Sequence, residues 1–228
     1  MPKSQTLDET HYDIVIVGGG MVGISLALLL AKQQATDGQS WKVLLIEAQP
    51  LDGLAAGAYT PSFDARSTAL SWSSHKIFES MGFWPELKKN VSEIRQIHVS
   101  DRGHVGLTRI SAEDAGVAAL GYVVENRWMG SLLLNQLAAT DVEIMSSTKI
   151  DTITPMMAGM KLTLDGTGQS VQTSLLVVAD GLGSSTALKL GITPNSSAYG
   201  QMGIIANITL EKPHGGIAYE RFTDQGPM

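Results

Sequence analysis

The chain contains no cysteine, which excludes disulfide frameworks, thiolate metal sites and redox-active cysteine pairs, and fits a reducing compartment. It has no apolar run near the roughly 18 residues that span a bilayer, so any membrane contact is predicted to be peripheral. Basic residues are in the minority, with 16 Lys and Arg against 22 Asp and Glu, and the net charge of −6 argues against nucleic acid as the main partner. Residues 1–11 lack the apolar core of a signal peptide and are predicted to be a disordered lead-in.

Common catalytic motifs are also missing. The GxSxG turn that presents a nucleophilic serine is absent, and the 5 histidines are scattered without HExxH or a comparable ligand spacing. No metal is therefore predicted. No residue can be named as a general base, so the catalytic residues are unknown from the sequence.

The strongest motif lies at residues 12–23, YDIVIVGGGMVG, and is followed by an uninterrupted apolar segment at 24–31. The first apolar run predicts a buried parallel strand, and the later segment predicts a helix. Gly18, Gly20 and Gly23 fit the GxGxxG spacing of a dinucleotide site. The first glycine allows a sharp turn, the second lets a pyrophosphate approach the backbone, and the third lets the helix pack against the strand.

The start of the predicted helix and a second strand complete this pattern. Met21 and Val22 lie in the first helical turn, where N–H groups and the positive end of the helix dipole would face the phosphates. The apolar segment 41–48 predicts the second strand, and Glu47 lies near its end. Its distance from the last glycine is close to the roughly 20 residues expected for the acid that binds a ribose hydroxyl. The alternative for Glu47 is a solvated carboxylate at the end of a strand.

A third apolar run, LLVVAD at 175–180, predicts another buried parallel strand, and it ends in Asp180 and Gly181. Parallel sheets bind ligands at the carboxyl ends of their strands, so this carboxylate and this turn are placed where a nucleotide would bind. Because Asp-Gly is also a common turn, the position in a third strand is what favours the binding role.

Two arginines are further candidates. Arg66 precedes a predicted helix and Arg127 opens one. A guanidinium at either place could contact a pyrophosphate or the edge of a flavin. Without further context, a surface ion pair is the favoured interpretation of each arginine.

The rest of the chain alternates short strands and helices. Residues 48–66 are predicted to be irregular, and DGTG at 165–168 to be a hairpin turn. Predicted helices cover 67–80, 84–90 and 127–139; predicted strands cover 94–100 with its partner 105–110, 121–125, 198–210 and 216–222.

Several peptides together resemble a known family: GGGMVG, DGLGSS, FDARSTAL, IHVSDRGHVG, LGYVVEN and YERFTDQGP. The chain resembles FAD-dependent aromatic hydroxylases of the para-hydroxybenzoate hydroxylase type, and within them the ubiquinone-biosynthesis branch. The resemblance runs from about Tyr12 to the last residue. HVSDRGH and ERFTDQGP are specific to the branch, whereas the glycine motif is not.

The resemblance implies an α/β fold, in which a Rossmann-like FAD-binding domain with inserted β-strands (12–192) is followed by the start of a mixed β-sheet substrate domain (193–228). Gly18, Gly20, Gly23 and Glu47 would bind the ADP half of FAD, Arg66 and Arg127 would lie near the flavin and pyrophosphate, and Asp180 and Gly181 would serve FAD and a nicotinamide cofactor.

The implied reaction is hydroxylation of a polyprenyl-phenol ring with NADH or NADPH and O₂. The implied location is the cytoplasm, with room for peripheral contact with the inner membrane and with other ubiquinone-biosynthesis proteins.

Two departures from the family pattern stand out. Ala187 occupies the place of an arginine that often follows the Asp-Gly motif, and no later Gly-Asp segment occurs. We therefore expect the chain to be the N-terminal portion of the enzyme. Two alternatives stay open: another flavin or NAD oxidoreductase, such as a prenyl reductase, and a nucleotide-binding fragment without catalysis.

Overall fold

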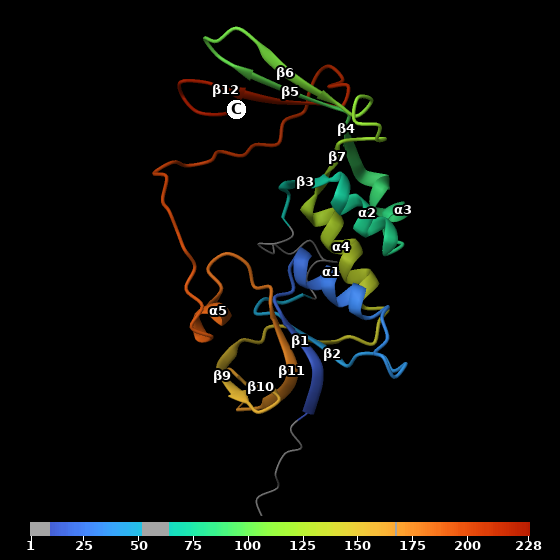
Figure 1. Cartoon of the computed structure of the whole chain (residues 1–228), viewed down its shortest axis with the longest axis vertical. Coiled ribbons are helices and arrows are strands. Elements are labelled where there is room, and N and C mark those ends of the chain that lie inside the picture. The colour runs from blue at the N-terminus through green and yellow to red at the C-terminus, as the bar shows by residue number, and fades with distance from the viewer. Residues whose placement is uncertain (1–9, 52–63, 167) are drawn as a thin grey trace, which may run out of the picture. The chain divides into compact units, whose positions relative to one another are not determined.

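The computed structural model describes residues 10–51, 64–166 and 168–228 (Figure 1). The chain divides into two compact units. The described residues of the first unit come from the N-terminus and from Gly130–Gln201, and those of the second come from Asp64–Met129 and Met202–Met228. The predicted domain boundary at residue 193 stays a prediction. The two compact units divide the chain differently from the predicted domains, because residues 64–129 belong to the same unit as residues 202–228.

The first unit is built on a six-stranded sheet with the order β8-β2-β1-β11-β10-β9. The four strands β8, β2, β1 and β11 run parallel, and β10 and β9 continue the sheet as an antiparallel meander. The prediction of three parallel strands around the glycine motif is confirmed. The strands of this sheet are β1 (Thr10–Val17), β2 (Val43–Ile46), β8 (Glu143–Met145), β9 (Ile150–Met156), β10 (Gly159–Leu164) and β11 (Ser170–Val178).

The apolar runs of β1 and β2 form the centre of this unit. Val15, Ile16 and Leu44 have no exposed surface, since both strands are flanked by other strands and covered on their faces. Burying each such side chain contributes about 1.5–3 kcal/mol. Helix α1 (Met21–Leu30) follows β1 directly, and the short α5 (Ser185–Lys189) follows β11.

The second unit holds two three-stranded sheets, ordered β12-β5-β6 and β3-β7-β4. The predicted hairpin between residues 94 and 110 is confirmed, because β5 and β6 pair antiparallel. The elements that begin in this unit are β3 (Ser67–Ser71), α2 (Trp72–Ser80), α3 (Trp84–Leu87), the 3₁₀ turn η2 (Lys88–Asn90), β4 (Val91–Ile94), β5 (Gln96–Asp101), β6 (Leu107–Ser111), β7 (Gly121–Glu125), α4 (Asn126–Leu137) and β12 (Ile217–Phe222).

Aromatic rings pack around a buried histidine in the second unit. The ring of His75, which is only 4% exposed, has its centroid 4.2 Å from that of Trp84, 4.7 Å from Trp72 and 5.1 Å from Tyr122. Its Nδ1 is buried and has no hydrogen-bond partner among the described residues. Burial lowers the pKa of His75, and the nearby lysines at 76 and 88 add to this against the opposing Glu79.

The predicted helix over 67–80 is wrong in its first five residues. Ser67–Ser71 form β3, which pairs antiparallel with β7, and the helix starts only at Trp72. Ser71 caps the helix, since its Oγ accepts a hydrogen bond from the backbone N–H of Ser74 at 3.2 Å. The serine cap fixes the start of α2 at Trp72, and the residues before it pair with β7, which lies about 50 residues later in the chain.

Two further expectations differ from the structure. The strand predicted over residues 198–210 is wrong, because these residues form irregular chain. Alternation of apolar and polar side chains is not sufficient for a strand when no other strand pairs with it. Strand β11 is parallel as predicted but less buried, because Leu175 is 54% exposed. Strand β1 begins at Thr10, two residues before the predicted start; the rest of the predicted lead-in, and residues 52–63 of the predicted irregular segment, lie outside the described residues.

Candidate functional site

The turn after β1 depends on Gly18. Its φ of +111° lies in the region that favours glycine, and its N–H donates to the Ile46 carbonyl at 2.8 Å. A Cβ at this position would collide with the Ala179 carbonyl and lie 2.7 Å from the Asp180 nitrogen. The sharp turn predicted for Gly18 is present, and it brings the chain against the end of β11.

Gly23 allows close approach of helix and strand. A Cβ on Gly23 would lie well inside 3.0 Å of the Gly18 carbonyl oxygen, a separation that real Cβ atoms essentially never show. Gly20 is the N-cap of α1; its backbone is extended, and it makes no side-chain cap hydrogen bond. The first N–H groups of the helix, near Met21 and Val22, are therefore not capped by a side chain and suit an anionic ligand.

Glu47 binds the glycine turn. Its Oε2 accepts a hydrogen bond from the Gly19 N–H at 2.5 Å, and its Oε1 accepts one from the Gln49 N–H at 2.7 Å. A Cβ on Gly19 would lie 2.9 Å from the Glu47 Cβ, so the middle glycine is also required. The sequence reasoning missed Gly19, although the run of three glycines was a signal for it. A carboxylate has about four acceptor sites, so Glu47 retains capacity for ribose hydroxyls.

Asp180 lies at the same edge of the sheet as the glycine turn. Because β1 and β11 are paired in parallel, their carboxyl ends meet, and the Ala179 N–H donates to the Val17 carbonyl at 2.7 Å. The Asp180 Oδ2 accepts from the Thr186 N–H at 3.3 Å, whereas its Oδ1 is buried without a partner among the described residues. Gly181 follows with a φ of +78°, as expected for the turn. A buried carboxylate oxygen without a partner is costly, which points to a ligand that donates to it.

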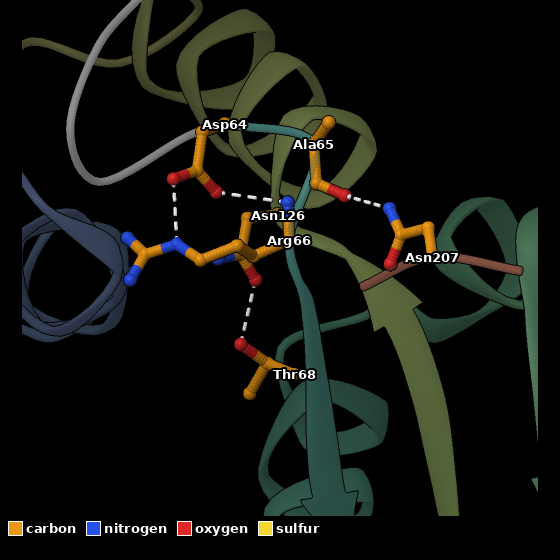
Figure 2. A network of polar contacts seen from close by, with 6 residues as sticks. All are labelled: Asp64, Ala65, Arg66, Thr68, Asn126 and Asn207. Atoms are coloured by element: carbon orange, nitrogen blue, oxygen red, sulfur yellow. Dashed lines mark hydrogen bonds and ion pairs between the residues drawn. The ribbon is translucent and has the colours of Figure 1, made fainter. Parts of the chain in front are cut away.

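Both arginines belong to the second unit, and Figure 2 shows the surroundings of Arg66. Arg66 ends the segment before β3, and Arg127 lies at the start of α4, just after β7. The Arg66 Nε donates to the Asp64 Oδ2 at 2.6 Å, and its backbone N–H donates to Oδ1 at 2.9 Å. The Arg127 N–H donates to the Asp64 carbonyl at 3.0 Å. Asp64, which the sequence reasoning did not single out, thus connects both arginines.

The charge of Asp64 is stabilised by its surroundings. Partial desolvation raises its pKa, but hydrogen bonds from Arg66 and Asn126 and the Arg66 charge outweigh this, so the pKa lies below its usual value. The side chain of Arg66 is 53% exposed, so its guanidinium is accessible from solvent. Asp64 is therefore a carboxylate held in its charged form, and the hydrogen bond from Nε to Asp64 restricts the position of the Arg66 side chain.

A comparison with family models identifies the family of this chain. Residues 13–128, which include the glycine turn, Glu47 and both arginines, match the model of the FAD dependent oxidoreductases. The chain belongs to this family. The α/β fold around a dinucleotide-binding sheet, predicted from the sequence, is confirmed.

Curated relatives of this FAD-dependent oxidoreductase include ubiquinone hydroxylases. The chain is 31% identical over 221 residues to the ubiquinone hydroxylase UbiL of Rhodospirillum rubrum, covering 95% of this chain and 48% of UbiL. It is 29% identical over 232 residues to the mitochondrial ubiquinone biosynthesis monooxygenase COQ6 of Homo sapiens, covering 96% and 48%. The chain thus spans about half the length of the curated relatives it matches.

Solved structures share the fold. A variant of PqsL from P. aeruginosa superimposes with a TM-score of 0.68 at 20% identity, covering 83% of this chain and 48% of PqsL. The p-nitrophenol 4-monooxygenase PnpA from Pseudomonas putida superimposes with a TM-score of 0.64 at 20% identity, covering 80% of this chain and 44% of PnpA.

Among the residues that the structure describes, none of the helices is long and apolar enough to cross a membrane.

The residues of the first unit fit the ADP half of FAD. The first N–H groups of α1 follow Gly20, which makes no side-chain cap hydrogen bond, so these groups can donate to a diphosphate. Glu47 supplies a carboxylate at the end of β2, and the unpartnered Oδ1 of Asp180 supplies an acceptor at the end of β11. These acceptors and donors are what ribose hydroxyls and phosphates require.

Proposed function

We propose that this chain forms the FAD-binding part of a monooxygenase that hydroxylates the ring of a polyprenyl phenol in ubiquinone biosynthesis, with NADH or NADPH and O₂ as co-substrates. The observation that carries the proposal is the match of nearly the whole chain to ubiquinone hydroxylases, centred on a glycine turn that meets Asp180 at one sheet edge. When bound, FAD would supply the redox chemistry that inserts an oxygen atom into the ring.

The residues of this chain would bind and orient the cofactor. The N–H groups at the start of α1, with Gly20, Met21 and Val22, would receive the diphosphate, and Glu47 would hold a ribose. Asp180 would accept a hydroxyl hydrogen bond through its buried Oδ1, with Gly181 providing the turn.

Arg66 and Arg127 are proposed contacts of the cofactor's anionic groups. A guanidinium suits a phosphate better than an ammonium does, because it can donate two parallel hydrogen bonds. Asp64 neutralises only part of the positive charge that the two arginines contribute.

The polyprenyl tail suggests how the enzyme would meet its substrate. Such a tail partitions into lipid, so peripheral contact with a membrane, from the cytoplasmic side, and contact with other ubiquinone-biosynthesis proteins belong to the same proposal.

The test separates cofactor binding from catalysis. Purified chain is titrated with FAD, and quenching of flavin fluorescence reports binding. Gly18→Ala is the disrupted variant, and Gly203→Ala, where an added Cβ would meet nothing within 4 Å, is the matched control. The chain is then fused to the C-terminal half of UbiL, and a prenylated phenol, NADH or NADPH and ¹⁸O₂ are supplied.

Label from ¹⁸O₂ in the phenol product supports the hydroxylase. FAD uptake without any label in the product would favour a nucleotide-binding fragment, and reduction of a prenyl double bond would favour a prenyl reductase. Absence of FAD uptake by the chain and by the fusion would refute the proposal.

A further inference from the structure

A buried amide lies behind the Asp64–Arg66 pair. Asn126 is 5% exposed and occupies the first position of α4. Its Oδ1 accepts a hydrogen bond from the Thr68 hydroxyl at 2.6 Å, and its backbone N–H donates to the Arg66 carbonyl at 2.9 Å. Two separate hydrogen bonds therefore fix this side chain and the backbone of Arg66.

The orientation of the amide has a consequence for Asp64. Because Thr68 occupies the oxygen side of the amide, the –NH₂ group is turned the other way, and the hydrogen bond from Asn126 is one of the interactions that favour the charged form of Asp64. The Asp64 carboxylate in turn receives both the N–H and the Nε–H of Arg66. Figure 2 shows both of these contacts between the Asp64 carboxylate and Arg66.

We propose that Asn126 is a positioning residue for Arg66, acting with Thr68 through Asp64 to aim the guanidinium at a phosphate group of a bound ligand. The identity of that phosphate as the pyrophosphate of FAD rests on the function proposed above. The positioning itself does not, since the four residues are connected within one unit.

A plain surface ion pair would not need this arrangement. An exposed pair of this kind is worth about 0–1 kcal/mol and leaves a long side chain free to sample other rotamers. A carboxylate held by a buried amide is already ordered, so the arginine that it binds loses less conformational entropy when a ligand arrives. The hydrogen bonds around Asp64 thus order the Arg66 side chain before a ligand binds.

Two substitutions at position 126 test the inference. Asn126→Asp keeps the acceptor for Thr68 and the backbone N–H but replaces the –NH₂ donor by an oxygen. Asn126→Ala removes the side chain without adding a charge, and it covers the case in which Asn126→Asp does not fold. The matched control is Asn207→Ala: Asn207 donates to the Ala65 carbonyl at 2.7 Å in the same network without contacting the Asp64 carboxylate.

The first measurement is independent of FAD. NMR follows exchange of the Arg66 Nε proton at neutral pH, which is slow when a carboxylate holds it. We expect exchange to become at least about fivefold faster in the Asn126 variants and to stay within about twofold of wild type in Asn207→Ala. Unchanged exchange in both Asn126 variants would overturn the inference, whether or not the chain binds FAD.

The second measurement asks whether Asn126 acts through Arg66. We expect Asn126→Ala to weaken FAD binding about tenfold in the wild-type chain and by less than about twofold in an Arg66→Ala background. A purely structural role would give the same factor in both backgrounds and would overturn the inference. Lack of FAD binding by wild type would refute the proposed function, and the exchange measurement would then decide the positioning role alone.

Discussion

Gly23→Ala puts the geometry of the glycine turn to a test with a defined sign. In an ordinary helix, alanine in place of glycine stabilises the protein by about 1 kcal/mol. Here the added Cβ would meet the Gly18 carbonyl oxygen well inside 3.0 Å, whereas ordinary contact begins at 3.4 Å. Gly18 cannot easily retreat, because its N–H is bonded to Ile46 and the Ala179 backbone lies behind it.

Helix α1 must therefore shift by on the order of 1 Å, and overpacking of this kind costs about 1–3 kcal/mol. We expect the free energy of unfolding to fall by that amount and FAD affinity to fall by about 100-fold, since the start of α1 moves away from the diphosphate. Urea denaturation and FAD titration measure the two effects, with Gly203→Ala as the control, since an added Cβ there would meet nothing within 4 Å. An increase in stability of about 1 kcal/mol in Gly23→Ala would refute the reasoning.

Three further outcomes follow from the structure. Leu44→Ala, at a fully buried position, should lower the free energy of unfolding by about 2–5 kcal/mol in urea denaturation, whereas Leu182→Ala, at a fully exposed position, should change it by less than about 0.5 kcal/mol. Asp180→Asn should weaken FAD binding about tenfold or more in a flavin titration, because an –NH₂ group replaces the buried Oδ1 that is proposed to accept a cofactor hydroxyl, while an oxygen can still accept from Thr186. The pKa of His75 in the folded state lies below the ordinary 6.5, so below pH 6.5 the unfolded chain binds more protons than the folded chain. The contribution of His75 to the free energy of unfolding should therefore be complete above pH 6.5 and be lost as the pH falls from 6.5 towards the folded-state pKa. Denaturation at several pH values should detect this loss, and His75→Phe should remove it.

The parallel strands around the glycine turn could be predicted because their signals are local. Continuous apolar runs indicate parallel strands, and parallel strands place their carboxyl ends at one edge, so the proximity of Gly18 and Asp180 followed without knowledge of the structure. The jobs assigned to Gly18 and Gly23 were visible in the same way, because each is a property of one residue and its spacing.

The parts that could not be predicted depend on distant partners. Ser67–Ser71 has little to distinguish it from the first turn of a helix until β7 pairs with it, and the alternating residues 198–210 show that a strand pattern does not supply its own partner. Asn126 resembles an ordinary residue at the start of a helix. Its connection to Thr68 and Asp64 arises from the pairing of β3 with β7, which no short motif records.

The pairing of β1 with β11 also sets a schedule for biosynthesis. Residue 17 meets residue 178, and everything between them must be synthesised before the sheet edge that holds both Gly18 and Asp180 exists. At about 5–20 residues per second, the glycine turn waits on the order of 8–30 s after leaving the ribosome for its neighbour. During that interval the apolar strand β1 has no partner on that side, which makes the nascent chain a candidate client for chaperones that shield exposed strands.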